Sequence, residues 1–300
     1  MAWTLSTSLD DLRLPAGDFL TAEPALNTVP LTIVDRLAKD GPHAFGAGQP
    51  RFGWWREGPR KPVSGVFVQT PPFGVVLGAM SGEAAGRLAE VPAEASAEPG
   101  ATAVPSVQGH TQAATAFARA WERATGGRAK VRERSRLYRL RSLARPEPAP
   151  RGSARSAVEA DHAVLVTWHE AFAAESGAGR SGAGRSSADH GALVRRRTAE
   201  GLLHIWEDGG RPVSFAGVGP VLGGMSRTGP VYTPPELRRR GYASGIVAAG
   251  ARHALALGAR EVVLFADLAN PTSNSIYQRL GYVPVHDALA LDLEPEAAAG

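Results

Sequence analysis

The chain has 300 residues, of which 43% are hydrophobic and 21% are charged, and its formal net charge is +4 at pH 7. This composition is that of a globular protein with a substantial core, and it excludes wholesale disorder. The absence of cysteine excludes a disulfide scaffold, thiolate metal sites and a cysteine nucleophile. No secretory leader opens the chain and no apolar run approaches the ~20 residues that span a bilayer, so we expect a soluble, cytoplasmic protein with no membrane partner.

The positive charge is weak evidence for a polyanionic partner. Three lysines are present (Lys39, Lys61, Lys130), so 30 of the 33 basic residues are arginines. Together with the many alanines, glycines and prolines, this resembles the codon bias of a GC-rich bacterial genome, and arginines of that origin spread over the whole surface. Charge alone therefore does not favour nucleic-acid binding as the main role.

The first half of the chain alternates strand and turn signals before a helix. The segment from Phe52 to Met80 predicts strand, turn, strand, turn, strand, and the segment from Thr111 to Gly126 has helical spacing. The alternation in residues 131–140 suits another strand. The proline-rich segment from Leu143 to Ser153 then excludes both helix and central strand, so it predicts a short, stiff, extended linker.

The second half repeats this layout, and in both halves a Pro-Val-Ser sequence (Pro62–Ser64 and Pro212–Ser214) opens a β-rich run. We therefore expect a tandem repeat of one α+β unit. The patterns predict, in order, a helix at Asp161–Ser176, a Gly/Ser-rich loop with the pentapeptide SGAGR duplicated at 176–185, a helix from His190, strands at Leu202–Glu207, Pro212–Val218 and about Gly229–Thr233, a helix in the stretch Pro234–Gly250, a strand at Arg260–Leu268, a helix from Thr272 and a last strand near Ala288–Leu293.

The strand-to-helix junction at Pro234 and Pro235 carries the first candidate site. Neither proline can donate to a sheet ladder, so the strand ends there. The helix that follows exposes unpaired backbone N–H groups and the positive end of its macrodipole, which together favour an anion. Gly241 and Ala243 are small enough for a phosphate to approach the main chain, and the arginines at 238–240 add positive potential. The glycine spacing fits neither a Rossmann fingerprint nor a P-loop.

Two motifs in this half resemble a known family. Arg238-x-x-Gly241-x-Ala243 after a strand resembles the acyl-CoA pyrophosphate signature of the GNAT superfamily of N-acyltransferases, (Gln/Arg)-x-x-Gly-x-(Gly/Ala). Further along, the segment Asn270 to Tyr282 resembles the second signature of that family, with Asn270, Ser273, Tyr277 and the pair Gly281–Tyr282 at the matching places. The two signatures stand in the expected order, and the resemblance covers roughly Ala154 to the C-terminus.

The resemblance implies an α+β fold of two GNAT-like domains in tandem, each a mixed, mostly antiparallel sheet flanked by helices. It implies a degenerate GNAT-like domain at residues 1–145, a Pro-rich linker at 146–153 and a catalytic N-acyltransferase domain at 154–300. The first half lacks both signatures and has Phe117 and Trp121 where a tyrosine acid would stand. We therefore expect this half to bind no CoA and to pack against the catalytic half, forming a wall of the acceptor cleft.

The resemblance also implies how acetyl-CoA or another acyl-CoA would bind, without a metal. Backbone groups of Val231, Tyr232 and Thr233 would bind the pantetheine arm, and a backbone N–H there would stabilise the oxyanion formed from the thioester carbonyl. Asn270, Ser273 and Asn274 would contact the pantetheine amides or border the thioester pocket. The pyrophosphate would be held at the helix start by the backbone and side chains of Arg238, Arg239, Arg240, Gly241, Tyr242, Ala243 and Ser244.

Tyr277 would be the general acid that protonates the departing thiolate. A phenol suits this role because its ordinary pKa near ~10 keeps it protonated at pH 7. The alternative reading, a core tyrosine with no catalytic role, stays open. The residue that deprotonates the amine is not identified, because each candidate also suits a surface or structural role; the candidates are Glu170, Glu175, His204, Glu207 and Asp267.

Three functions remain in view. The first is an N-acyltransferase that acts on the primary amine of a small molecule. The second is an acyltransferase whose donor is a carrier-protein thioester or an aminoacyl-tRNA, and the third is a non-catalytic acyl-CoA-binding module. Asn270 and Tyr277 favour an enzyme, because a sensor needs no leaving-group acid. No motif identifies the acceptor amine.

Overall fold

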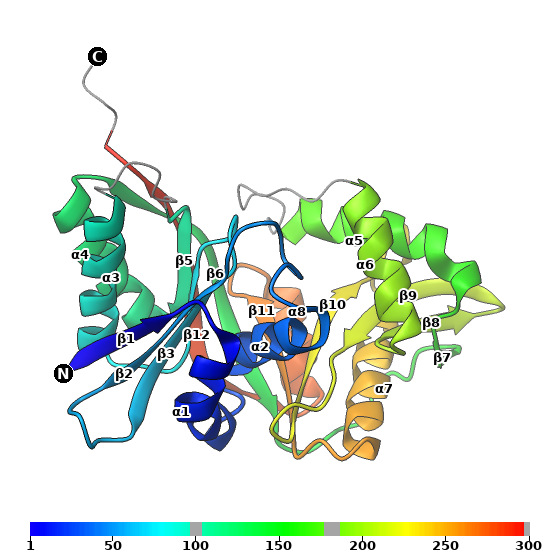
Figure 1. Cartoon of the computed structure of the whole chain (residues 1–300). Helices are drawn as coiled ribbons and strands as arrows, with labels where there is room; N and C mark the ends of the chain where they lie inside the picture. The colour runs from blue at the N-terminus through cyan, green and yellow to red at the C-terminus, as the bar shows by residue number, and fades with distance from the viewer. Residues whose placement is uncertain (97–103, 177–186, 297–300) are drawn as a thin grey trace. The chain divides into compact units, whose positions relative to one another are not determined.

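The computed structural model describes residues 1–96, 104–176 and 187–296 (Figure 1). Within them the chain forms two compact units. Unit 1 contains residues 1–96, 104–135 and 287–296, so the end of the chain belongs with its beginning. Unit 2 contains residues 136–176 and 187–286. Most of the duplicated SGAGR sequence falls at 177–186, outside the described residues.

Unit 1 is a mixed sheet with helices packed on it. Its strands neighbour one another in the order β1-β2-β3-β4-β5-β12, and the pairs are antiparallel except for the parallel pair β4–β5. The elements are β1 (Ala2–Ser6), α1 (Leu9–Ala22), α2 (Thr28–Asp40), β2 (Arg51–Arg56), β3 (Val63–Gln69), β4 (Val75–Leu77), α3 (Gly82–Ser96), β5 (Ser106–His110), α4 (Thr111–Thr125), the first part of β6 (Arg128–Leu140) and the second part of β12 (Tyr282–Glu294).

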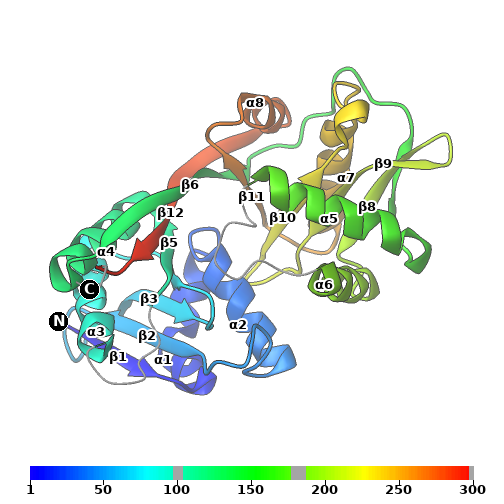
Figure 2. The ribbon, with the colours of Figure 1, turned by 90° about the horizontal axis from the view of Figure 1, so that it is seen from above.

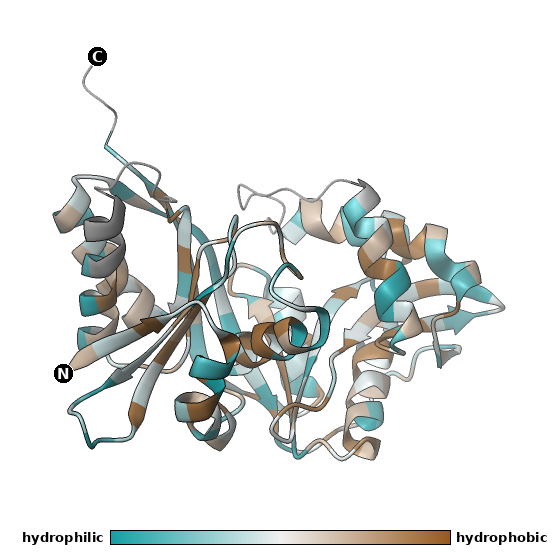
Figure 3. Ribbon diagram, viewed as in Figure 1, coloured by the Kyte–Doolittle hydropathy of each residue, from teal (hydrophilic) through white to brown (hydrophobic). Residues whose placement is uncertain are grey.

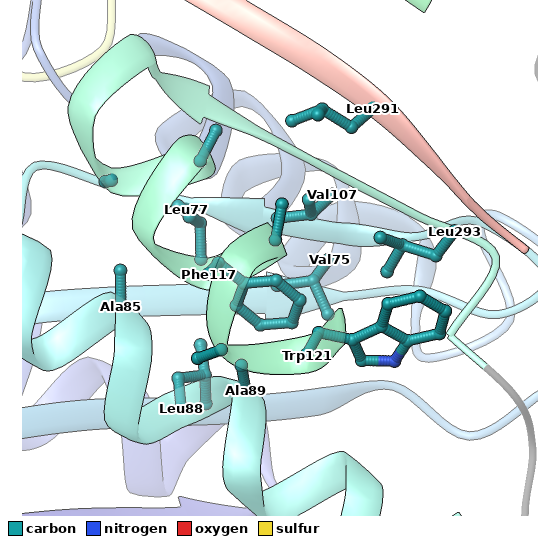
Figure 4. Close-up of a cluster of buried hydrophobic side chains, with 14 of the residues drawn as sticks. Val75, Leu77, Ala85, Leu88, Ala89, Val107, Phe117, Trp121, Leu291 and Leu293 are labelled. Carbon is teal, nitrogen blue, oxygen red and sulfur yellow. The ribbon is translucent and has the colours of Figure 1, made fainter. Parts of the chain in front are cut away.

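The core of unit 1 depends on the last strand of the chain. Leu291 and Leu293 of β12 belong to the same buried cluster as Phe117 and Trp121 of α4 (Figure 4). Strand β12 also pairs with β5, from Ala288 opposite His110 to Asp292 opposite Ser106. Each fully buried leucine contributes about 1.5–3 kcal/mol. The N-terminal part of the sequence therefore completes its fold with residues from the C-terminus.

Unit 2 is a second mixed sheet, with neighbouring strands in the order β6-β11-β10-β9-β8-β7. Here the parallel pair is β10–β11. The elements are the second part of β6, β7 (Ser153–Ser156), the 3-10 turn η1 (Glu159–Asp161), α5 (His162–Ser176), α6 (Ser187–Ala199), β8 (Leu203–Asp208), β9 (Arg211–Val218), β10 (Met225–Tyr232), the 3-10 turn η3 (Pro235–Leu237), α7 (Tyr242–Ala256), β11 (Glu261–Asp267), α8 (Pro271–Arg279) and the first part of β12.

The two faces of the unit 2 sheet are covered by different helices (Figure 2). On one face, Trp168 of α5 packs with Ile205 and Phe215 in one buried cluster. On the other face, Trp206 and Ala216, which follow Ile205 and Phe215 in the sequence, belong to a buried cluster with Ile246 of α7. Successive strand residues point to opposite faces, so this alternation along β8 and β9 sorts the helices to the two sides.

Amphipathic patterning accounts for the helices that cover the sheets. Leu31, Val34 and Leu37 of α2 are buried, whereas Lys39 in its last turn is exposed, and Figure 3 shows both apolar and hydrophilic segments on this helix. No helix in the described parts of the chain is long and apolar enough to cross a membrane.

Most elements expected from the sequence are confirmed, including the helices α4 to α8 and the three strands of Phe52–Met80. The last strand was expected near Ala288–Leu293, but β12 begins earlier, at Tyr282, and includes Pro284. Strand β10 likewise begins at Met225, before the predicted Gly229. The segment 143–152 forms neither helix nor strand, as expected, and β7 follows it directly.

Candidate active site

The parallel strands β10 and β11 separate at their carboxyl ends. They pair from Met225 opposite Glu261 to Thr228 opposite Leu264. In this fully described stretch no further pair forms between them, although β10 continues to Tyr232 and β11 to Asp267. Backbone donors and acceptors on the facing edges of the two strands are thereby left for another extended chain. We call these unpaired, facing strand ends, beyond Thr228 of β10 and Leu264 of β11, the slot.

The separation begins at Gly229 and Pro230. The register between β10 and β9 shifts between Thr228 and Val231, which marks a β-bulge. A proline has no N–H with which to continue a ladder, and a bulge bends the strand that carries it. The sequence Gly-Pro in the middle of β10 therefore explains why this strand leaves β11.

Helix α7 begins beside the separated strands with its backbone donors free. The N–H groups from Arg239 to Ser244 have no hydrogen-bond partner among the described residues. The N-cap residue Gly241 has a φ of 81°, which glycine adopts without strain, and Arg239 has a φ of 64°. Left-handed residues in such loops favour concave groups of N–H donors, and the helix dipole adds positive potential. This loop is therefore suited to a phosphate.

A cavity of about 420 Å³ lies next to the start of α7. It is lined by Ser244 of α7, by Ile276 and Arg279 of α8 and by the linker residues Arg145 and Glu147. Two arginines face one glutamate here, so the formal charge of these side chains is positive. The cavity thus continues the anion-binding loop into a space bordered by α8 and the linker.

The linker itself is anchored to unit 2 at both ends. Ala144 N donates a hydrogen bond to Leu280 O at 3.1 Å, and Trp206 Nε1 donates to Arg151 O at 2.7 Å. Between these bonds, Pro150 packs against Gly241, whose position leaves just enough room for it. The segment 144–151 is consequently a fixed wall beside the helix start.

Arg238, the first residue of the phosphate signature, turns toward the end of β10. Its Nη2 donates to Glu175 Oε2 at 2.6 Å and its Nε donates to Thr233 O at 2.9 Å. The guanidinium lies 5.8 Å from the ring centre of Tyr232, whose hydroxyl donates to Glu175 Oε1 at 3.2 Å. Burial, and after it the Glu175 carboxylate, raises the pKa of Tyr232. Arg238 is thus tied to strand β10 and helix α5.

Other side chains of this junction stabilise the loop. Tyr242 is buried and its hydroxyl donates to Asp208 Oδ2 at 2.6 Å. Thr233 Oγ1 and Ser214 Oγ are hydrogen-bonded at 2.9 Å. Arg240 Nη2 donates to Glu236 O at 3.4 Å. Ala243 is half-buried, so the main chain of the first helical turn reaches the surface.

The second signature forms the start of α8. Asn270 is the N-cap residue and its Oδ1 accepts a hydrogen bond from Ser273 N at 3.1 Å. Asn274 donates through Nδ2 to Asp267 O at 2.8 Å and to Asn270 O at 2.7 Å. Its Oδ1 accepts from the hydroxyl of Tyr138 at 2.8 Å. The side chain of Asn274 therefore joins β6, β11 and α8, and a contact with pantetheine stays a prediction.

Tyr277 lies in a cluster of three tyrosines. Its ring centre is 6.3 Å from that of Tyr138 and 6.1 Å from that of Tyr282. Burial raises the pKa of Tyr277 to about 12, so the hydroxyl stays protonated at neutral pH. In contrast to Tyr138, Tyr277 has no recorded hydrogen bond of its hydroxyl to any described residue. Its role as the general acid stays a prediction.

The candidate bases have different surroundings. His204 is buried 4.5 Å from the ring of His253, and Glu207 accepts a hydrogen bond from Arg155 Nε at 2.6 Å, so both have structural contacts. Asp267 Oδ1 accepts from Ala269 N at 2.8 Å. Glu175 lies at the end of β10 as described above. Among all described residues, no group of acidic and histidine side chains is arranged to hold a metal ion.

Two residues of unit 2 were missed in the sequence. Tyr138 belongs to the N-terminal half of the sequence, and only its alternation within residues 131–140 was visible. Arg197 of α6 donates through Nη2 to Gly229 O, at the bulge of β10, at 3.1 Å. In the sequence it belongs to the cluster Arg195–Arg197, which suggested contact with a carrier-protein or nucleic-acid donor and gave no sign of a contact with Gly229.

Unit 1 has the corresponding strands without the slot. Where β4 ends, Leu77 lies against Gly109 of β5 so closely that a Cβ on Gly109 would be 2.8 Å from that of Leu77. Beyond β4, the backbone N–H of Ala79 donates a hydrogen bond to Oδ1 of the buried Asn27 at 2.9 Å, so this N–H is not available to a ligand. Helices α3 and α4 also touch through small residues, as at Gly82 and Ala116.

The separated strands β10 and β11 and the start of α7 lie within a region that matches a known family. Residues 166–282 match the model of the acetyltransferase (GNAT) family. The family transfers acyl groups from CoA, and its members use acyl-CoA as co-substrate.

Solved structures extend the likeness over the whole chain. An acetyltransferase of the GNAT family from Colwellia psychrerythraea is 14% identical, with a TM-score of 0.57, and the match covers 99% of this chain and 100% of that one. A GCN5-related N-acetyltransferase from Sphaerobacter thermophilus is 15% identical, with a TM-score of 0.59 and coverage of 97% and 95%. A Drosophila protein is 13% identical, with a TM-score of 0.65 and coverage of 98% and 99%.

At identities this low, structural likeness bears on the fold alone. It confirms the expected fold class of two GNAT-like domains with mostly antiparallel sheets flanked by helices. The boundaries 1–145 and 154–300 stay a prediction. A search of curated proteins found no match to this sequence.

Proposed function

We propose that unit 2 is the catalytic part of an N-acyltransferase that moves an acetyl or other acyl group from CoA to the primary amine of a small molecule. The observation that carries the proposal is the slot between β10 and β11, which opens beside the free N–H groups from Arg239 to Ser244. An extended amide chain that ends in a pyrophosphate has the shape and charge for this pair of features.

The donor would bind along unit 2 in three parts. Backbone groups of Val231, Tyr232 and Thr233 would hold the pantetheine arm, and the amides of residues 239–244 would hold the pyrophosphate. The cavity lined by Arg145 and Arg279 would then receive the nucleotide. A phosphopantetheine on a carrier protein has no nucleotide, so this cavity favours free acyl-CoA over the carrier-protein or tRNA donor.

The chemistry requires one proton to reach sulfur. The amine nitrogen attacks the thioester carbonyl carbon, the C–N bond forms, the C–S bond breaks and the thiolate leaves. Tyr277 would donate its proton to that sulfur, because a thiolate is basic enough to take it. A backbone N–H of β10 would stabilise the oxyanion in between. The ammonium form of the acceptor must lose one proton before the attack, and the attacking nitrogen loses a second as the neutral amide forms. This second proton balances the one that Tyr277 gives to sulfur, and we assign neither loss to a residue.

We further propose one donor site per chain. In unit 1 the side chain of Asn27 accepts the hydrogen bond from the backbone N–H of Ala79, and the side chain of Leu77 is in close contact with Gly109. Isothermal titration of the full chain with acetyl-CoA is therefore expected to give a stoichiometry of one. A stoichiometry of two would refute the view that unit 1 is closed.

Thiol release from acetyl-CoA, measured against a panel of amines, tests the enzyme proposal. We expect turnover with at least one amine, and a roughly 100-fold lower kcat in Tyr277→Phe at unchanged CoA affinity. Tyr282→Phe is the matched control, because Tyr282 is buried in the same cluster and has no assigned role. Equal kcat in wild type and Tyr277→Phe would remove Tyr277 from the mechanism.

The same assay separates the alternatives. Acetyl-CoA should react faster than an acetylated pantetheine that lacks the nucleotide. Equal rates, or binding of an acylated carrier or charged tRNA without binding of CoA, would favour the other donor class. CoA binding without thiol release from any amine would leave a non-catalytic binding module.

A further inference from the structure

The bulge that opens the slot in unit 2 is held by a side chain from helix α6. The carbonyl of Gly229, at the point where β10 leaves β11, accepts a hydrogen bond from Arg197 Nη2 at 3.1 Å. Hydrogen bonds from a charged donor are stronger than neutral ones. The hydrogen bond is thus made to the bulge itself, at which β10 changes direction.

The C-terminal end of α6 fixes the backbone position of Arg197. Leu202 N donates to Arg197 O at 2.8 Å and Gly201 N donates to Thr198 O at 3.0 Å, with Gly201 at a φ of 68°. This pair of bonds is a Schellman motif, which fixes the last helical turn. Leu202 O also accepts from Val218 N at 2.9 Å, so the motif is joined to β9.

The strand next to the bulge leaves room for the side chain. Gly217 of β9 lies under the guanidinium, and a Cβ at this position would overlap Arg197 Nη2. A residue with any side chain would therefore displace the arginine from the Gly229 carbonyl. Three elements, namely the end of α6, Gly217 of β9 and the bulge of β10, meet at one hydrogen bond.

We propose that Arg197 is a positioning residue for acyl transfer. By holding the Gly229 carbonyl, it fixes the direction of Val231, Tyr232 and Thr233, whose backbone would hold the thioester. This inference rests on the proposed function. The pyrophosphate amides at 239–244 belong to a separate loop, so Arg197 acts on the reacting carbonyl and leaves the anchoring of CoA unchanged.

The test compares Arg197→Met, which keeps a long side chain without a donor, with Arg197→Lys, which keeps a charged donor. Arg196→Met is the matched control, because Arg196 is the preceding residue and pairs with Glu200 on the same helix at 3.7 Å. Each variant is measured for kcat by thiol release, for CoA affinity by titration and for amide hydrogen exchange in residues 229–233.

We expect kcat to fall roughly 10- to 100-fold in Arg197→Met, as a misplacement of about 1 Å does elsewhere. CoA affinity should stay within about twofold, Arg197→Lys should recover part of kcat, and exchange in 229–233 should rise only when Arg197 is changed. An unchanged kcat and unchanged exchange in a folded Arg197→Met overturn the inference. If Arg197→Met does not fold, Gly217→Ala decides instead, because a Cβ there would overlap Arg197 Nη2: kcat and exchange equal to wild type in that variant overturn the inference. Absence of turnover in the wild type instead refutes the proposed function, and the exchange measurement then still decides whether Arg197 holds the bulge.

Discussion

His204 of β8 makes the stability of the protein depend on pH in a way that can be calculated. The side chain is 6% exposed and its ring centre lies 4.5 Å from that of His253 on α7. Burial, and after it the positive charge of His253, lowers the pKa of His204 from 6.5 to about 4. The folded protein therefore disfavours protonation of a group that the unfolded chain protonates readily.

The direction of the effect follows from which state binds the proton. Above pH 6.5 both states leave His204 neutral, so its contribution to stability is constant. As the pH falls from 6.5 toward 4, the unfolded chain takes up the proton first and stability decreases. At 1.36 kcal/mol per pKa unit, the complete loss is about 3 kcal/mol, and about 2 kcal/mol of it occurs between pH 7.5 and pH 5.

Urea unfolding of wild type and His204→Leu at pH 7.5 and pH 5 measures this loss. Leucine has a similar volume, has no charge, and leaves no donor or acceptor in place of Nε2, which has no hydrogen-bond partner among the described residues. Between the two pH values the wild type should lose about 2 kcal/mol more than His204→Leu. His43→Leu is the control, because His43 is exposed, and it should behave like wild type. The same pH dependence in wild type and His204→Leu would refute the assignment; His110, whose pKa is also lowered by burial, leaves a remaining slope in both.

Two further predictions concern stability. Arg155 holds the buried carboxylate of Asp161 with bonds of 2.7 and 2.9 Å and so lowers its pKa, and Arg155→Met should cost roughly 3 kcal/mol at pH 7. The contribution of this ion pair to stability is present above the unfolded pKa of aspartate and is lost as the pH falls. The difference in unfolding free energy between Arg155→Met and wild type should therefore shrink in acid. An equal difference at pH 7 and pH 3.5, measured by urea unfolding, would contradict this. In unit 1, Leu291→Ala should cost about 2–5 kcal/mol, whereas Leu5→Ala, at a position 48% exposed, should change stability by less than about 0.5 kcal/mol; equal losses by urea unfolding would show that β12 does not complete this core.

The sequence predicted the parts of the fold that local patterns determine. Strand β11 was expected within one residue at each end, because its apolar run is bounded clearly. A helix was also expected in the stretch Pro234–Gly250, but α7 runs from Tyr242 to Ala256, so its existence was predicted better than its bounds. The exchange of segments between the units was not predicted. Nothing local in residues 287–294 distinguishes a strand that pairs with β5 from one that stays with its own half.

The candidate site was predicted to the extent that it consists of backbone. The motif around Gly241 indicated a helix start, and Gly241 is the N-cap residue of α7. Binding of an anion at this start stays a prediction. Side-chain roles were harder to predict. A place for Arg238 near the phosphates stays a prediction, and its observed partner, Glu175, lies 63 positions earlier in the sequence.

The two units show which residues turn one fold into a possible active site. In unit 2, Gly229 and Pro230 interrupt β10, and Arg197 holds the resulting bulge, so the parallel strands separate. In unit 1, β4 has no bulge: it ends at Leu77 against Gly109 of β5, and its next free donor is taken by Asn27. We therefore propose that an acyl-CoA slot in this chain needs both an interrupted strand and a backbone donor that the protein itself leaves unused. On this proposal, unit 1 lacks both features while it keeps its sheet and helices, so that unit 2 alone would bind the donor.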